Sequence, residues 1–71
     1  MDINKSLLIR IGNNIRNYRE AINISQEELA YRVGLNRTHI GMIERAEKNI
    51  TILTLEKIAK ALDKSICDLT K

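Results

Sequence analysis

The side chains with the clearest chemical potential lie in one short segment, GLNRTHIGMIER at residues 34–45. If this segment forms a helix, its 3.6-residue periodicity places Thr38 and Arg45 opposite the apolar side chains. Arg37 lies at the edge of the same face, and Met42 lies beside it. Arginine can donate two hydrogen bonds to guanine, a hydroxyl can bond several bases, and an apolar tip can contact the thymine methyl group. This face therefore has the chemistry to read base edges in a DNA major groove.

Three positions in the same segment leave their roles open. Met42 fits DNA contact and partial burial equally well. For His39, packing or a phosphate contact is favoured over base reading. Gly41 costs about 1 kcal/mol against alanine inside a helix, and close approach to DNA would account for its small size. For Arg37 or Thr38 taken alone, an ordinary solvated surface is the alternative.

The helix that precedes this face is predicted from its start signal. Ser25 and Glu28 have the spacing of a capping box, in which the serine oxygen and the glutamate carboxylate each bond a free amide. A short helix is therefore expected at about 26–33. Ala30 lies where two helices are expected to cross closely, because a larger side chain would clash there.

Gly34 marks the turn, since it falls where that helix ends and the chain needs a positive φ. Two residues later Asn36 can cap a second helix, which is expected to run from Arg37 to about Ala46. A connection this short sends the second helix off at a steep angle. Residues 25–46 are therefore predicted to form a helix-turn-helix.

Three further helices complete an all-α prediction, because apolar residues recur every three or four positions along the chain. The first helix is expected to bury one apolar stripe: Leu8, Ile11, Ile15, Tyr18 and Ile22. Thr51 can cap a fourth helix, whose inward side chains are Leu55, Ile58, Ala59 and Leu62. Ser65 with Asp68 can cap a last turn at 66–69. The sequence thus predicts one compact five-helix domain over residues 1–71.

Composition excludes several classes of protein. The net charge of +3 in 71 residues favours a polyanionic partner only weakly. The one cysteine, Cys67, rules out an internal disulfide and is expected to be a small buried residue. No cluster has metal-ligand spacing, and no nucleophile pairs with a base, so we expect no metal, no cofactor and no enzyme activity. With no apolar run of about 18 residues and no signal peptide, we expect a cytoplasmic protein without membrane contact.

The segment SQEELAYRVGLNRTHIGMIER resembles the helix-turn-helix of the phage-repressor and Cro-like (XRE-type) family, and the likeness extends from about Ile11 to Leu62. Within that family, LNRTHI, IER and KNITI are similar to the controller proteins of restriction–modification systems. The resemblance implies a lambda-repressor-like fold and a transcriptional regulator that binds double-stranded DNA as a homodimer on a near-palindromic operator. RNA polymerase is a further candidate partner. A prophage repressor or an antitoxin-like protein-interaction subunit is the alternative.

The resemblance also implies roles for individual residues. It implies that Arg37, Thr38 and Met42 read bases. We add His39, from the same helix, to the base-reading residues. Contacts to the DNA backbone are expected from Gln26, Asn36, Arg45, Lys48, Asn49 and Thr51. Arg19 and Glu44 match a structural ion pair, and Ile66 and Leu69 match the dimer surface. The family usually has glycine where this chain has Ala46, so the third helix can end differently and shift the residues after it.

Overall fold

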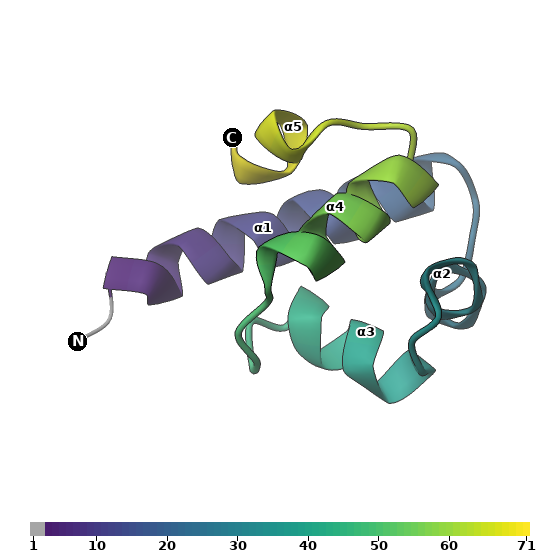
Figure 1. Ribbon diagram of the computed structural model, residues 1–71, viewed down its shortest axis with the longest axis horizontal. Helices are drawn as coiled ribbons and strands as arrows, with labels where there is room; N and C mark the ends of the chain where they lie inside the picture. Colours follow the sequence, from purple (N-terminus) through teal and green to yellow (C-terminus); the bar gives the residue numbers. More distant parts are fainter. Residues whose placement is uncertain (1–2) are drawn as a thin grey trace.

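The computed structural model describes residues 3–71 and folds them into five α-helices without a β-strand, which confirms the all-α prediction for this range. The helices are α1 (Ile3–Ala21), α2 (Gln26–Val33), α3 (Arg37–Glu44), α4 (Ile52–Ala61) and α5 (Ile66–Thr70). Residues 1 and 2 of the predicted domain lie outside the described residues. Figure 1 shows α3 at the bottom of the molecule and α5 at the top, with α1 and α4 between them.

Side chains from all five helices build one apolar core. The largest fully buried members are Ile15, Leu29, Ile40, Ile58, Leu62 and Leu69. The predicted stripe on α1 is buried at Ile11 and Ile15, whereas Leu8 and Tyr18 are half-buried. The prediction for Ile22 is wrong, because α1 ends at Ala21 and the next side chain no longer follows the helical stripe; Ile22 is 46% exposed.

The closest approach of α1 to α3 is made possible by Gly12. A β-carbon on this residue would lie 2.5 Å from the backbone oxygen of Glu44 and 2.7 Å from that of Ile43. Backbone atoms cannot turn aside as a flexible side chain can, so any larger residue must push the two helices apart. Ala30 on α2, predicted to lie at a close crossing, is buried as expected. Gly12 therefore sets how closely α1 and α3 approach each other.

The predicted helix starts are confirmed, with one difference in detail. Ser25 Oγ accepts a hydrogen bond from the backbone N–H of Glu28 at 2.9 Å, and α2 has the bounds that this cap predicts. The second half of the predicted capping box is wrong, because the Glu28 carboxylate accepts from Arg32 Nε one turn later, at 2.9 Å. In α5 the box forms completely, between Ser65 and Asp68.

Four helices end in the same way, with one residue in the left-handed backbone region and amides that bond back to the last turn. These residues are Asn23, Gly34, Ala46 and Asp63, with φ of 60°, 76°, 60° and 59°. Glycine and short polar residues adopt this conformation readily, whereas alanine does so at a cost. Ala46, which stands where the family usually has glycine, adopts this left-handed conformation, and α3 ends at Glu44 and not near residue 46. Its carbonyl oxygen accepts a hydrogen bond from Lys5 Nζ at 2.7 Å.

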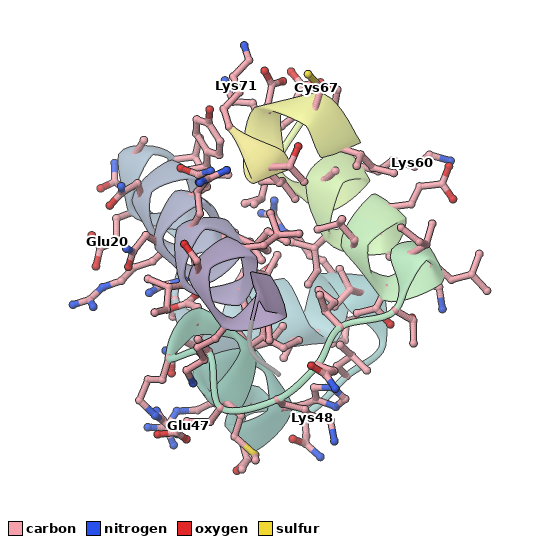
Figure 2. The ribbon with its side chains drawn as sticks, turned by 90° about the vertical axis from the view of Figure 1, so that its left-hand side faces the viewer. Glu20, Glu47, Lys48, Lys60, Cys67 and Lys71 are labelled. Carbon is pink, nitrogen blue, oxygen red and sulfur yellow. The ribbon has the colours of Figure 1, made fainter. Side chains whose placement is uncertain are left out.

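The prediction that Cys67 is buried is wrong. Its thiol is exposed on α5, and Figure 2 shows it at the edge of the molecule near Lys71. Leu69, two residues later, points the other way and is fully buried. On a helix this short one face alone reaches the core, so the two positions cannot both be buried.

Candidate nucleic-acid interface

The outward surface of α3 presents the side chains that the sequence predicts for it. We call this surface the recognition face and define it by Arg37, Thr38, His39, Met42 and Arg45. Arg37, Thr38 and Arg45 are exposed, while His39 and Met42 are half-buried. Ile40 and Ile43, on the opposite side of α3, are in the core. The face is held outward because the two isoleucines fix the rotation of the helix.

The start of this helix is fixed by Asn36, whose Oδ1 accepts from the backbone N–H of His39 at 2.7 Å. Asn36 lies close after Gly34, whose left-handed backbone lets α2 turn into α3 within three residues. Thr51 plays the same capping part for α4, accepting from the Thr54 N–H at 3.1 Å. Both capping residues were expected at the DNA backbone, and both remain exposed beside a helix N-terminus.

A hollow of about 170 Å³ lies between α2 and the recognition face, lined by Gln26, Arg37, Thr38, Gly41 and Arg45. Two guanidinium groups, a hydroxyl and an amide therefore meet in one place. Gly41, whose small size close approach to DNA would have explained, is buried beneath its neighbours. A β-carbon there would lie 3.1 Å from Arg45 Nη1, so the small residue makes room for the arginine side chain.

A buried ion pair beneath the hollow links α1 to α3, as the resemblance implies. Arg19 Nε donates to Glu44 Oε2 at 2.7 Å, and Arg19 Nη2 donates to Glu44 Oε1 at 3.1 Å. Gln26 Nε2 adds a third bond to the same carboxylate, at 3.0 Å to Oε1. The hydrogen bond to Glu44 raises the pKa of Arg19 above its usual range, although burial opposes the shift. One carboxylate thus fixes α1, α2 and α3 relative to each other.

The segment after α3 carries an ion pair that was not predicted from the sequence. Arg45 Nε lies 3.1 Å from Glu47 Oε2, and both side chains are more than half exposed. The hydrogen bond with Glu47 raises the pKa of Arg45, and the same bond lowers the pKa of Glu47. Figure 2 shows Glu47 and Lys48 at the α3 end of the molecule, away from Lys60, Cys67 and Lys71. The acidic residue two positions after Arg45 was the available signal for this pair.

Apolar side chains line a second hollow, of about 330 Å³, which we call the apolar groove. Its walls come from α1, the segment before α4, α4 itself and α5: Leu7, Leu8, Ile11, Asn49, Ile50, Ile52, Leu55, Ile66 and Thr70. Ile66, expected at the dimer surface, lies in this groove. The same expectation for Leu69 is wrong, because its side chain is 0% exposed and has no area left to give a partner. Asn49, expected at the DNA backbone, also lines the groove.

Among the residues that the structure describes, no group of histidine, cysteine or acidic side chains is arranged to hold a metal ion. Within the same range, none of the helices combines the length and the apolar character needed to cross a bilayer.

Known proteins share both the sequence pattern and the fold of this chain. The profile of the helix-turn-helix family HTH_3 matches residues 15–69. The chain is 48% identical over 66 residues to the control protein C.SmaI of Serratia marcescens, covering 93% of this chain and 74% of that one. It is 40% identical over 58 residues to the control protein C.BamHI of Bacillus amyloliquefaciens, covering 80% and 72%.

Among solved structures, the restriction–modification controller protein C.AhdI of Aeromonas hydrophila superposes with a TM-score of 0.88 at 34% identity. The superposition covers 94% of this chain and 97% of that one, so the likeness includes all five helices. This is a family of DNA-binding regulators and not one of enzymes. The chain therefore belongs to the helix-turn-helix family of DNA-binding transcription regulators, in which restriction–modification control proteins are among its relatives.

Proposed function

We propose that the protein is a homodimeric regulator that binds a near-palindromic operator in the cytoplasm and controls transcription of a restriction–modification system. The observation that carries this proposal is the recognition face, where Arg37 and Thr38 project from a helix whose other side is locked in the core. A single α-helix with these groups fits the major groove of B-DNA. The control-protein relatives favour restriction–modification over a prophage or antitoxin setting.

Base selection is assigned first to Arg37 and Thr38. Both are exposed and both line the polar hollow, so they can reach a base edge without rearrangement. Met42 and His39 are half-buried, which leaves them less surface with which to contact a base. They act as the outer part of the same reading surface, Met42 through apolar contact and His39 through a base or a phosphate.

Contacts to the DNA backbone supply most of the affinity in proteins of this kind, and base contacts supply the choice of site. Arg45 and Lys48 bring positive charge to the α3 end of the molecule, and Asn49 follows them in the chain. Asn36 and Thr51 sit at helix N-termini, where backbone amides favour a phosphate. The ion pair with Glu47 partly neutralises the positive charge of Arg45, so its net contribution to phosphate binding is reduced.

We place the second copy of the chain on the apolar groove. Leu7 and Ile52 line it and are 38% and 68% exposed, and Leu53, the next residue along α4, is 70% exposed. Apolar area of this kind is stabilised by burial against a partner. Ile66 contributes directly, whereas Leu69 acts by holding α5 on the core. A two-fold dimer would place two recognition faces on half-sites about one helical turn, roughly 34 Å, apart.

In vitro selection of bound DNA tests the whole proposal. The expected result is a consensus with two inverted half-sites at a fixed spacing. A single unrepeated half-site would contradict the dimer but keep the recognition face. If no sequence is enriched at modest ionic strength, the proposal itself is contradicted.

A further inference from the structure

Gln26 stands between the buried ion pair and the polar hollow, and the orientation of its amide decides what it can recognise. The resemblance implies a phosphate contact for this residue, which requires an N–H pointing at the DNA. The contacts around Glu44 favour a different orientation. Any recognition role for Gln26 rests on the proposed function, because the same surface must select the DNA.

The amide nitrogen is held by Glu44. Gln26 Nε2 lies 3.0 Å from Glu44 Oε1, an oxygen that also accepts from Arg19 Nη2. An ionised carboxylate can only accept hydrogen bonds, so the amide must turn its nitrogen and not its oxygen toward it. Glu44 is itself fixed, because it is 7% exposed and bonded by two nitrogen atoms of Arg19. The ion pair thereby sets which end of the Gln26 amide faces outward.

The amide oxygen therefore faces the hollow. A β-carbon on Gly41 would lie 3.5 Å from Gln26 Oε1 and 3.1 Å from Arg45 Nη1, so both groups border the same space. Arg37 and Arg45 bring guanidinium groups to that space, and these are donors without an acceptor. The hollow thus combines an acceptor on the α2 side with donors on the α3 side.

We infer that Gln26 is a specificity-determining residue whose Oε1 accepts a hydrogen bond from an exocyclic amino group, N6 of adenine or N4 of cytosine. A base edge in the major groove offers this donor beside acceptors such as guanine O6 and N7, which suit the neighbouring Arg37. A phosphate offers acceptors alone, and these would repel the amide oxygen. Gln26 therefore belongs with the base-reading residues and not with the backbone contacts.

The experiment uses operators made from the selected consensus, with the amino group removed at one position at a time. Purine replaces adenine, and 2-pyrimidinone replaces cytosine. The dissociation constant of each operator is measured for the wild-type chain and for Gln26→Met, which keeps the length of the side chain but has no amide. Comparing the two proteins on each operator cancels the effect of the analogue on base pairing. Lys48→Met is the matched control, because loss of a surface charge should weaken all operators by one common factor.

At one position of the half-site, removal of the amino group should weaken wild-type binding about five-fold more than it weakens Gln26→Met, the size of one neutral hydrogen bond. Lys48→Met should keep the wild-type pattern. Equal effects of every analogue on wild type and Gln26→Met would overturn the inference and return Gln26 to the phosphate contacts. If selection gives no consensus at all, the proposed function fails first. Thermal unfolding checks that each variant is folded, and Gln26→Ala provides a second, smaller replacement.

Discussion

The recognition face and the apolar groove are both open to solvent, yet they are built in opposite ways. The recognition face is polar, and its side chains are set by buried groups behind them: isoleucines on α3 and the carboxylate of Glu44. The apolar groove is lined by leucine and isoleucine side chains from four separate segments, with no comparable buried polar anchor among its lining residues. Reading bases requires groups held in a fixed direction, whereas burying apolar area requires only a matching shape.

This difference separates the expected effects of mutation. Changes at the recognition face should alter which DNA is bound, and changes at the groove should alter the protein concentration at which binding occurs. Changes to the shared support beneath the face should destabilise the fold itself. Unfolding is best measured at one fixed protein concentration throughout, because dimerisation adds to apparent stability.

The largest effect is expected from Glu44→Ala, which removes the support of the recognition face. Arg19 is 8% exposed and would be left as a buried charge without its main partner. Breaking a buried pair on one side costs about 3–5 kcal/mol, which is most of the stability of so small a domain. Urea denaturation followed by circular dichroism measures the loss. A cost below about 1 kcal/mol would mean that the pair behaves as a surface salt bridge.

Gly12→Ala is expected to cost about 1–3 kcal/mol, because the added methyl group meets backbone oxygens of α3 that cannot move alone. Gly41→Ala is the matched control. Its methyl group would meet the end of the flexible Arg45 side chain, so its effect on unfolding should be much smaller. Similar melting temperatures for the two variants would show that α1 and α3 separate easily.

Arg37→Ala should weaken binding to the preferred operator by about 1–3 kcal/mol and binding to random DNA much less. The reason is that a base contact exists only where the matching base is present. Fluorescence anisotropy on both DNAs gives the ratio of affinities. Equal losses on the two would reassign Arg37 to the phosphate backbone and weaken the contrast between the face and its surroundings.

Ile52→Ala tests the groove. Its side chain is 68% exposed, so truncation should leave the monomer almost unchanged. In a two-fold dimer the loss occurs twice, and dimerisation should weaken by about 1–2 kcal/mol. Tyr31→Ala, which removes an 82% exposed side chain on α2 outside the groove, is the control. Analytical ultracentrifugation of the two variants would falsify the placement of the dimer surface if they behave alike.

The smallest effect is expected from Ala46→Gly at the end of α3. Glycine relieves the left-handed backbone of residue 46, whose φ is 60°, but it is also more flexible in the unfolded chain. The net gain in the free energy of unfolding should be about 0.5 kcal/mol. Calorimetry detects it as a slightly higher melting temperature. A decrease would mean that the buried methyl group of Ala46 contributes more than its backbone costs.

Much of the fold was predictable because its signals are local. Ser25, Asn36, Thr51 and Ser65 each cap a helix through an amide three residues later, so each start can be read from a few neighbouring letters. The positive φ at residue 34 was predictable in the same way, because the glycine and the helix end beside it are local signals. The end of α3 was predicted two residues late, because alanine carries no stop signal and its left-handed conformation is supported by Lys5, which is 41 residues away.

The candidate site was predictable in its residue types but not in its arrangement. Helical periodicity alone predicted that Thr38 and Arg45 face outward, and both side chains are exposed in the structure. The pairing of Arg19 with Glu44 came from family resemblance, since the two are 25 residues apart and no local spacing connects them. The resemblance also misplaced Leu69, because an apolar residue near a chain end fits the core and a partner surface equally well until α5 is docked.

The sequence by itself determined the number of helices, where the last four of them start and which side of α3 faces solvent, because these depend on hydrogen bonds and periodicity within a few residues. The tertiary structure alone decided which apolar side chains remain for a partner, how closely Gly12 lets α1 meet α3, and which end of the Gln26 amide faces the hollow. Each of these depends on atoms from helices far apart in the chain, and only packing brings such atoms within contact distance.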